Sequence, residues 1–380
     1  MTRIAPGVVR ANSGERNKYL VIARPPSIVR LDSGAPSFRT PEHISHAGVE
    51  AIREGHTSYA PWQGTPELLH AVCEYIARDT QVSYRSDEVL ITHGASSGIY
   101  AVMATLLAPG DEILLLDPTY SLYAPDALFV GAIPVAVPHN ANYHIDVDAV
   151  KAAVTARTKM VLISNPNNPT GVAYGRDELR TLLQVCKDCD LFMVVDEAYS
   201  KILQPGVEHV PILSFSEHRE RIILLMTFSK TYAMTGWRLG YVVAPKDVLQ
   251  HMLGFHLSIN GPICTFVQCA GVAALLGPQD CIAEFGAHYQ RRGALMHRLA
   301  QGIRGLNPVT PQGGFYLYCK YDMNLPAVEV RQRLWDAGVA VRTGSEFGAA
   351  GEGHLRFTYA VDESTIERGM AVVAQVFSRL

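Results

Sequence analysis

The sequence has no marked excess of charge of either sign. Its 380 residues include 33 lysines and arginines against 36 aspartates and glutamates, which gives a formal net charge of -3. No five consecutive residues carry the same charge. Binding to a phosphate backbone needs a concentration of positive charge, so the composition argues against a nucleic-acid partner. Small metabolites are the expected ligands.

Long uninterrupted apolar runs are also missing. The first twenty residues contain no apolar block of seven or more, so no secretory signal is expected. Residues 248–279 contain no Lys, Arg, Asp or Glu, and that stretch exceeds the roughly twenty residues that cross a bilayer. Gly261-Pro262 interrupts it, and the remaining Ile263–Leu276 has the length of a buried helix. No membrane segment is therefore expected.

Cysteines are few and irregularly placed. The chain has seven, and an odd number of scattered cysteines is typical of reduced thiols in the cytoplasm. Cys186 and Cys189 form a single C-x-x-C pair, whereas a zinc site needs four ligands. The 14 histidines show no H-x3-H or H-E-x-x-H spacing. No metal site is expected.

The middle of the chain alternates between strand and helix patterns. Helical stretches such as Asp177–Cys186 separate several short β-rich apolar runs, which are Val89–Thr92, Ile113–Leu116, Ile133–Val137, Met160–Ile163, Leu191–Val195, Ile222–Met226 and Tyr241–Val243. Runs that are apolar on both faces predict a largely parallel sheet covered on both sides. The sequence thus favours an α/β fold with a seven-stranded, mostly parallel sheet.

Two helix starts are well marked, and the pattern changes near residue 279. Thr40-Pro41-Glu42 and Thr65-Pro66-Glu67 each place a capping hydroxyl before a proline and an acid. The C-terminal part predicts a long helix, short strands and a last helix, at Ala283–Leu299, Gly314–Tyr318, Val339–Arg342, His354–Thr358 and Glu363–Phe377. At about 150 residues per domain, two or three domains are expected. We predict a large domain at 46–279 and a smaller α+β domain from 1–45 and 280–380.

Polar residues follow four of the predicted strands directly. These segments are Thr92–Gly98, Ser164–Gly171, Asp196–Tyr199 and Thr227–Lys230. Each one alone is typical of an ordinary turn. Because ligands bind at the carboxyl ends of strands in open α/β sheets, the four segments are expected to meet in one crevice.

These segments also carry a resemblance to a known family. Ser229-Lys230-Thr231-Tyr232-Ala233-Met234-Thr235-Gly236-Trp237-Arg238-Leu239-Gly240 resembles the lysine motif of the class I/II aminotransferases. Asn168-Pro169-Thr170-Gly171 and Asp196-Glu197-Ala198-Tyr199 are similar to two further motifs of that family, in the same order. The resemblance extends from about Leu31 to Arg356. It implies a fold-type-I enzyme that uses pyridoxal 5'-phosphate, commonly a homodimer with shared active sites.

The resemblance implies that two residues carry out the central chemical steps. Lys230 would bind the cofactor aldehyde covalently and later move a proton on the substrate. Asp196 would pair with the pyridine nitrogen and keep it protonated, which makes the ring an electron sink. At an effective dielectric of about 20, such a pair contributes roughly 4–5 kcal/mol, or about three pKa units.

The remaining cofactor contacts follow in the same way. Asn168 and Tyr199 resemble the partners of the cofactor's phenolic oxygen, and Tyr120 falls where the family stacks an aromatic ring on the cofactor. The phosphate would lie at a helix N-terminus, with an arginine and hydroxyls around it. The residues for that phosphate site are Gly94, Ala95, Ser96, Thr227, Arg238 and Tyr59, the last donated by the neighbouring subunit.

Arg356 resembles the arginine that holds the substrate's α-carboxylate, with Gly34 and Asn168 beside it. Several positions depart from the family pattern and bear on the substrate. Ser96-Ser97 stands where aspartate-using relatives often have a basic residue, and Trp62 is a large aromatic that would line the partner's pocket. Thr343 replaces a common proline, and Ala35 a frequent acid. We therefore predict transfer of an amino group between an α-amino acid and a 2-oxo acid by a ping-pong mechanism, with a neutral or aromatic substrate.

Other functions stay open at this point. The same cofactor residues would serve a lyase, a racemase or a biosynthetic cyclase. Gly94-Ala95-Ser96-Ser97-Gly98 also matches the G-x-S-x-G elbow of serine α/β-hydrolases, with Asp196 and His354 as the possible acid and base. A regulator with an aminotransferase-like ligand domain would need a DNA-binding arm, and only about thirty residues precede Leu31.

Overall fold

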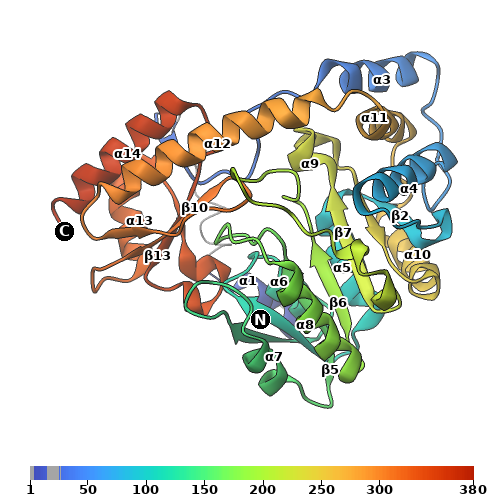
Figure 1. Ribbon diagram of the computed structural model, residues 1–380, viewed down its shortest axis with the longest axis horizontal. Helices are drawn as coiled ribbons and strands as arrows, with labels where there is room; N and C mark the ends of the chain where they lie inside the picture. The colour runs from blue at the N-terminus through green and yellow to red at the C-terminus, as the bar shows by residue number, and fades with distance from the viewer. Residues whose placement is uncertain (1–3, 15–24, 26) are drawn as a thin grey trace.

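The computed structural model describes residues 4–14, 25 and 27–380. One sheet has the strand order β2-β8-β7-β6-β5-β3-β4 (Figure 1). Its strands are β2 (Val89–Thr92), β3 (Glu112–Asp117), β4 (Ile133–Pro138), β5 (Thr158–Ser164), β6 (Phe192–Asp196), β7 (Ile222–Thr227) and β8 (Gly240–Val243). Only β8 is antiparallel to its neighbours β2 and β7. The predicted seven-stranded, mostly parallel sheet is confirmed.

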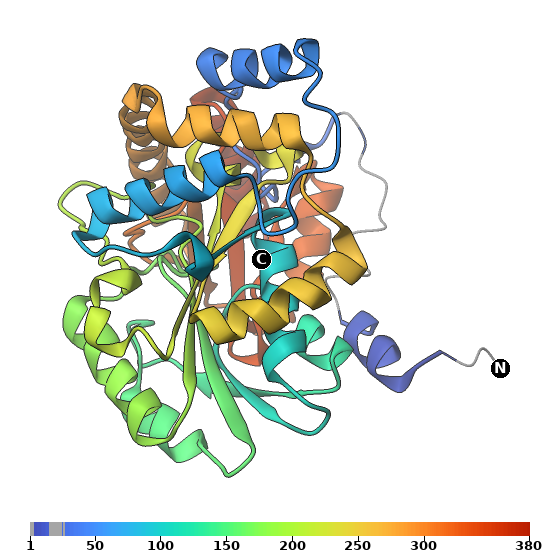
Figure 2. The same ribbon diagram turned by 90° about the vertical axis from the view of Figure 1, so that its right-hand side faces the viewer.

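Helices cover both faces of this sheet (Figure 2). Successive strand side chains point to opposite faces, so Ile113 and Leu115 pack in one core cluster while Leu114 and Leu116 pack in the other. One face is covered by α5 (Gly94–Leu106), α6 (Tyr123–Phe129) and α10 (Lys246–Asn260). The other is covered by α4 (Pro66–Thr80), α8 (Arg176–Asp188) and α11 (Thr265–Leu276). Burial on both sides explains why the inner strands are apolar throughout, whereas the edge strand β4 is only partly buried.

A second core lies in the C-terminal part of the chain. A four-stranded antiparallel sheet has the order β12-β13-β10-β9. Its elements are β9 (Leu306–Pro308), β10 (Tyr316–Tyr321), β12 (Arg342–Thr343) and β13 (His354–Thr358), with helices α12 (Asp280–Gln301), α13 (Ala327–Asp336) and α14 (Glu363–Phe377). The long α12 extends from this group towards α11 (Figure 1). The predicted strand over 339–342 is two strands, because β11 (Val339–Ala340) pairs with β1 (Val29–Arg30) while β12 pairs with β13.

The N-terminal residues contribute to both cores. β1 pairs with β11 in parallel, and Leu31 belongs to the C-terminal core. In contrast, α1 (Pro6–Asn12) lies against α6, where a Cβ on Gly7 would be 2.7 Å from the carbonyl oxygen of Leu128. The helix α3 (Glu42–Arg53) packs on α11. The domain boundaries at 45/46 and 279/280 stay a prediction.

One of the two predicted helix caps is confirmed. The Thr65 hydroxyl accepts a hydrogen bond from the Leu68 amide at 3.3 Å at the start of α4. The prediction for Thr40 is wrong, because Pro41 precedes α3 without a side-chain cap. The Thr40 hydroxyl instead donates to the Ala233 carbonyl at 2.9 Å and accepts from Trp237 Nε1 at 3.1 Å. Tertiary partners compete here with the local cap.

The apolar stretch near residue 263 forms a buried helix, as predicted. Ala270, Ala274 and Leu275 of α11 are buried in the sheet core. No single helix among residues 4–14 and 27–380 is long and apolar enough to cross a membrane. By length and composition, α11 and α12 pass that test only when they are taken as one pair, and the pair is bent by 79° at the break between the two helices.

Candidate active site

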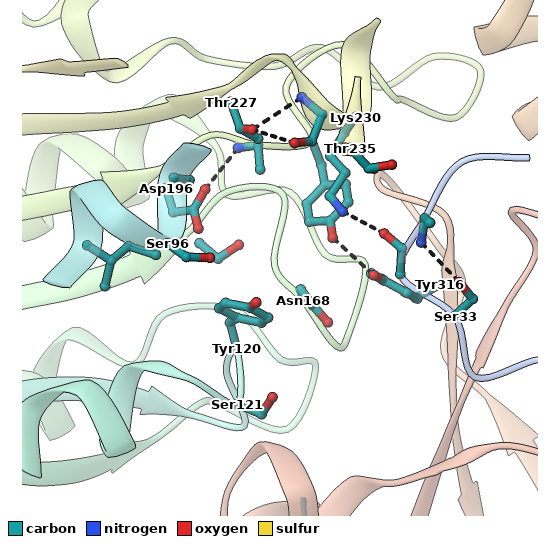
Figure 3. Close-up of a pocket in the computed structure, with 18 of the residues that line it drawn as sticks. Ser33, Ser96, Tyr120, Ser121, Asn168, Asp196, Thr227, Lys230, Thr235 and Tyr316 are labelled. Carbon is teal, nitrogen blue, oxygen red and sulfur yellow. Dashed lines mark hydrogen bonds between the residues drawn. The ribbon is translucent and has the colours of Figure 1, made fainter. Parts of the chain in front are cut away.

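A cavity of about 390 Å³ lies where the carboxyl ends of the sheet strands meet the C-terminal part of the chain. The predicted residues that line it are Gly34, Ala95, Ser96, Tyr120, Asn168, Asp196, Tyr199, Thr227, Lys230, Arg238 and Arg356. Figure 3 shows Ser96, Asp196, Asn168 and Tyr120 around this space. The strand ends therefore meet in one cavity, as the parallel sheet requires.

Lys230 lies in α9 (Phe228–Thr231), the short helical turn that follows β7. Its Nζ donates to the carbonyl oxygen of Gly34 at 2.5 Å. Burial lowers the pKa of Lys230 from its ordinary value. A lowered pKa increases the fraction of neutral amine, which is the form that attacks an aldehyde.

Asp196 ends β6 and is 6% exposed. The Tyr123 hydroxyl donates to Oδ2 at 2.8 Å, and the Ala198 amide donates to Oδ1 at 3.1 Å. Burial raises the pKa of Asp196, against the effect of these two hydrogen bonds. A carboxylate in such a position gains from a ligand that brings positive charge, such as a protonated ring nitrogen.

A cup of hydrogen-bond donors lies at the start of α5. Ala95 and Ser96 of its first turn line the cavity, and Gly94 begins the helix with a φ of +74°. A Cβ on Gly94 would lie 2.9 Å from Arg238 Nη2, so a glycine lets the guanidinium approach the helix N-terminus. Arg238 Nη1 donates to the Thr235 carbonyl at 2.9 Å and Nη2 to the His93 carbonyl at 3.3 Å. A helix N-terminus beside an arginine suits a phosphate.

The hydroxyl of Thr227 lies at the other side of this cup. It donates to Ser229 Oγ at 2.9 Å and accepts from the Ser229 amide at 3.2 Å. Both residues line the cavity. Ser229 is therefore a further cavity hydroxyl that the sequence analysis did not single out.

Arg356 is held rigidly on β13. Its Nη1 donates to Asn168 Oδ1 at 2.8 Å and its Nη2 to the Asp32 carbonyl at 3.4 Å. The guanidinium carbon lies 3.9 Å from the centre of the Tyr316 ring and 4.5 Å from that of Phe347. Burial lowers the pKa of Arg356. Two aromatic rings and two hydrogen bonds thus fix the orientation of a planar, paired donor.

Two tyrosines connect the lysine and arginine sides of the cavity. The hydroxyls of Tyr199 and Tyr316 are 3.1 Å apart. Burial, reinforced by Tyr316, raises the pKa of Tyr199, so its phenol stays protonated. The ring of Tyr120 contacts Tyr123 edge-on at 5.4 Å between centroids, which places it close to the Asp196 side.

Three predicted residues do not line the cavity. Gly94 lies behind it, under Arg238. Tyr59 and Trp62 lie on the surface of the chain, 93% and 64% exposed. Their proposed contributions to a neighbouring subunit's site stay predictions.

The alternative serine-hydrolase triad is not assembled. Ser96 and Asp196 line the cavity, but His354 does not. The imidazole of His354 stacks on Tyr318 at 4.9 Å between centroids, and its Nε2 is 2.8 Å from the Tyr143 hydroxyl. The base therefore lies in a separate cluster from the nucleophile.

The sequence analysis missed several residues that line the cavity from the C-terminal part, namely Tyr316, Arg342 and Phe347. Arg342 lies directly opposite Arg356 in the β12–β13 pair. Residues opposite each other in an antiparallel pair share a face of the sheet. The strand pairing was the missing signal, because sequence spacing alone does not give the register.

The donors in this cavity fit pyridoxal 5'-phosphate. A buried lysine matches its aldehyde, a buried carboxylate matches its ring nitrogen, and the helix N-terminus with Arg238 matches its phosphate. Among the residues that the structure describes, no group of three or more His, Cys, Asp or Glu side chains could hold a metal ion.

Comparisons with known proteins agree with this geometry. The family description "Aminotransferase class I and II" matches residues 26–373. An aspartate aminotransferase from Pyrococcus horikoshii is 33% identical over 90% of this chain and 89% of its own length. A probable aspartate/prephenate aminotransferase from Thermus aquaticus is 35% identical, over 92% and 91%.

Solved structures extend the likeness to the fold. The crystal structure of an aromatic aminotransferase from Pyrococcus horikoshii OT3 has a TM-score of 0.91 and 31% identity, and the match covers 98% of this chain and 99% of that one. Together with the family match and the curated relatives, this likeness shows that the chain has the type I fold. The chain belongs to the class I and II aminotransferases, a family of enzymes that use pyridoxal phosphate.

Proposed function

We propose that this aminotransferase acts on amino acids with neutral or aromatic side chains, with Lys230 and Arg356 as its principal catalytic and substrate-binding residues. The observation that carries the proposal is their common cavity, which Asp196 and the N-terminus of α5 also line. The cofactor, when bound there, supplies an aldehyde for the amino group and a ring that accepts electrons.

Lys230 would act as the general base and acid. Its Nζ would take the proton from the substrate Cα, and the lowered pKa of Lys230 favours the neutral amine that this step needs. The contact with the Gly34 carbonyl keeps Nζ on the side of the cavity that faces the C-terminal part.

Arg356 would bind the α-carboxylate of the substrate through paired donors. Contacts with the rings of Tyr316 and Phe347 restrict the plane of the guanidinium, and Asn168 fixes its rotation. A fixed carboxylate fixes the direction of the Cα–H bond, which selects loss of the proton over loss of the carboxylate.

The other predicted residues would hold the cofactor. Asp196 would keep the ring nitrogen protonated, and Tyr199 with Asn168 would contact the phenolic oxygen. Gly94, Ala95, Ser96, Thr227 and Arg238 would surround the phosphate, and Tyr120 would lie against the ring. Each of these groups except Gly94 lines the cavity.

The preference for a neutral or aromatic side chain rests on the apolar surfaces of the cavity. Ile99 and the rings of Tyr120, Tyr316 and Phe347 line it. Such surfaces gain from burying an apolar or aromatic side chain. One structural relative is an aromatic aminotransferase.

A dicarboxylic substrate is the second candidate, and Arg342 favours it. Arg342 lines the cavity and lies opposite Arg356 in the strand pair, so it could bind a second carboxylate. Its guanidinium is already paired with Glu346, whose side chain is fully buried. Several relatives are aspartate aminotransferases.

We also propose a homodimer with shared active sites in the cytoplasm. The 93% exposure of Tyr59 supports a role in a neighbouring subunit's site. All seven cysteines are free thiols, in agreement with a reducing compartment.

A labelling experiment tests the central assignment. Borohydride would make the bond between lysine and cofactor permanent, and peptide mass mapping is expected to find the added mass on Lys230. The matched control is Lys230→Ala, which should carry no label. Label on another lysine, or none in cofactor-loaded protein, would contradict the proposal.

A substrate screen tests the specificity. Phenylalanine, methionine and aspartate would be compared with 2-oxoglutarate as acceptor, following formation of the new 2-oxo acid and of pyridoxamine phosphate in single turnovers. A kcat/KM for aspartate at least about tenfold above the other two, or 1.4 kcal/mol of discrimination, would favour the dicarboxylic candidate. Formation of other products without pyridoxamine phosphate would indicate a lyase, racemase or cyclase.

A further inference from the structure

A buried carboxylate outside the predicted site joins the two parts of the molecule. Asp117 is the last residue of β3 and is 8% exposed. Among the residues that the structure describes, no lysine, arginine or histidine forms an ion pair with it, and its oxygens face backbone amides. Tyr120 and Ser121, three and four residues further on, line the cavity (Figure 3).

The partner of Asp117 is the connection between β12 and β13. The Ala350 amide donates to Asp117 Oδ2 at 3.1 Å. Two residues after Asp117, the Thr119 amide donates to the Phe347 carbonyl at 2.8 Å. The turn after β3 and the residues 347–350 are thus joined at two points.

Gly348 is shaped to this carboxylate. A Cβ at that position would lie 1.8 Å from Asp117 Oδ1, and Gly348 has a φ of +139°. Only glycine therefore lets the loop backbone lie against the carboxylate without moving one of the two.

The loop that Asp117 holds carries one of the two rings around Arg356. The centre of the Phe347 ring lies 4.5 Å from the guanidinium carbon of Arg356, and that of Tyr316 lies 3.9 Å from it. Phe347 is the residue directly before Gly348, and its carbonyl accepts from Thr119. A displaced loop would therefore take the ring away from the arginine.

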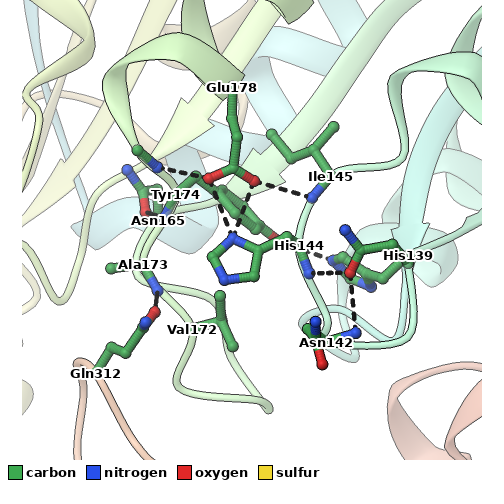
Figure 4. A network of polar contacts seen from close by, with 12 residues as sticks. His139, Asn142, His144, Ile145, Asn165, Val172, Ala173, Tyr174, Glu178 and Gln312 are labelled. Carbon is green, nitrogen blue, oxygen red and sulfur yellow. Dashed lines mark hydrogen bonds and ion pairs between the residues drawn. The ribbon is translucent and has the colours of Figure 1, made fainter.

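The turn after β3 is itself anchored from behind. His139 Nδ1 lies 3.1 Å from the Asp117 carbonyl, and His139 Nε2 lies 2.8 Å from the Tyr174 hydroxyl (Figure 4). The Tyr174 amide donates to Asn165 Oδ1 at 2.9 Å, three residues before Asn168. Asp117 is thus fixed on the sheet side, so the loop is the partner that it positions.

We propose that Asp117 is a positioning residue that holds the 347–350 loop in place, so that Phe347 keeps Arg356 ready for the substrate carboxylate. The inference rests on the role proposed for Arg356. It deepens that role, because the orientation of the arginine then depends on a contact between strand β3 and the β12–β13 connection.

Two substitutions disturb this contact from opposite sides. Asp117→Ala removes the acceptor of the Ala350 amide, and Gly348→Ala introduces a Cβ that meets the carboxylate. Each is expected to raise the dissociation constants of 3-phenylpropionate and succinate for the holoenzyme by about tenfold, the usual cost of losing a hydrogen bond to a charged group. Both probes carry a carboxylate and no amino group, and their remaining groups differ, so a loss of affinity that both share reports on the carboxylate site.

Two conservative variants serve as matched controls. Asp117→Asn keeps an acceptor for the Ala350 amide and is expected to stay within about threefold of the native constants. Gly353→Ala changes another glycine of the same connection, with a φ of +79° and no atom within 4 Å of its Cβ. It carries the same kind of backbone strain without the contact, so it should leave both constants within about twofold.

Hydrogen–deuterium exchange gives a readout that does not depend on binding. The amides of 344–351 should exchange faster in Asp117→Ala and Gly348→Ala than in the native protein, while those of the sheet stay unchanged. If Asp117→Ala does not fold, Gly348→Ala and Asp117→Asn decide the question.

The outcomes separate this proposal from the function on which it rests. Arg356→Ala should weaken both probes by far more than the other variants. If Arg356→Ala has no effect, the assignment of the carboxylate site is wrong. If it has an effect while Asp117→Ala and Gly348→Ala stay within twofold, or if Asp117→Asn is as impaired as Asp117→Ala, the positioning role is wrong.

Discussion

Burial acts on Lys230 and Asp196 in opposite directions. It lowers the pKa of the lysine and raises that of the aspartate, because both lose hydration in the charged form. In the cofactor-free protein the charged form of each group is therefore destabilised by lost hydration. A bound cofactor would supply a partner that offsets this loss. This is a common arrangement where a protein is built to hold a charged ligand.

A stability measurement can test whether burial destabilises the charged form of Asp196. Its folded pKa is raised, so its contribution to stability is fully present below the unfolded pKa near 3.8 and is lost as pH rises through the folded pKa. Asp196→Asn should therefore stabilise the cofactor-free protein at pH 7, with the gain fading near pH 4. Urea unfolding at both pH values measures the effect.

The same variant should lose activity. The ring nitrogen would no longer be held protonated, and the rate is expected to fall about a thousandfold from the three pKa units involved. Asp148→Asn, at a carboxylate that is 96% exposed, is the control for both measurements. A normal rate in Asp196→Asn would remove this residue from the mechanism.

Arginine and lysine should not be interchangeable at position 356. A lysine keeps the charge but loses the paired donors and the contacts of a planar guanidinium with the rings of Tyr316 and Phe347. Arg356→Lys is expected to lower kcat/KM by about a hundredfold, mainly through KM, because the paired donors are the groups proposed to bind the substrate. Arg333→Lys, on the surface of α13, is the matched control and should be neutral.

At the scale of elements, the proposed phosphate site at the start of α5 depends on one helix terminus and one glycine. A Cβ on Gly94 would press on Arg238. Gly94→Ala should therefore displace the guanidinium and weaken binding of the cofactor by about tenfold, measured by equilibrium dialysis. Gly110→Ala is the control for backbone strain alone, because Gly110 has a φ of +93° and open space where its Cβ would lie. Equal losses in the two variants would mean that only strain matters.

Local sequence patterns predict the strands of the large sheet better than the segments that pair over long distances. All seven strands of the large sheet were predicted within one or two residues, because their apolar runs are continuous. Six of them are largely buried on both faces, and the edge strand β4 is only partly buried. The 339–342 segment was predicted as one strand and forms two, since each half pairs with a different neighbour. The Thr40 cap failed for a similar reason, because its hydroxyl has partners 193 and 197 residues away in the chain.

For the whole molecule, the proposed homodimer would let one subunit complete the site of another. Tyr59 is 93% exposed and does not line the cavity of its own chain. If it acts across an interface, Lys230→Ala and Tyr59→Ala chains should complement each other. A hybrid dimer would contain one site with both residues intact.

Co-expression with two affinity tags would isolate that hybrid. About half of the native activity per dimer is expected, because one of two sites is complete. The matched control pairs Lys230→Ala with Asp196→Ala, which lie in the same cavity and leave no complete site in a hybrid. An inactive Lys230/Tyr59 hybrid, or a monomer in sedimentation, would contradict the shared site.

The sequence by itself determined the sheet, the helices that cover it and the residues at its strand ends. Strand patterns depend on neighbouring residues, and parallel strands bring their carboxyl ends to one edge whatever lies between them. The sequence pattern therefore places Lys230, Asp196 and Asn168 together, and all three line the cavity.

Only the tertiary structure decided what surrounds these residues. Arg342 faces the cavity because β12 pairs with β13 in one register, and Phe347 stacks on Arg356 because Asp117 and Thr119 hold its loop. The contacts of Asp117 and Thr119 with this loop join segments more than two hundred residues apart in the chain. No local pattern encodes them, because the register and the packing of such segments are fixed only when the two cores come together.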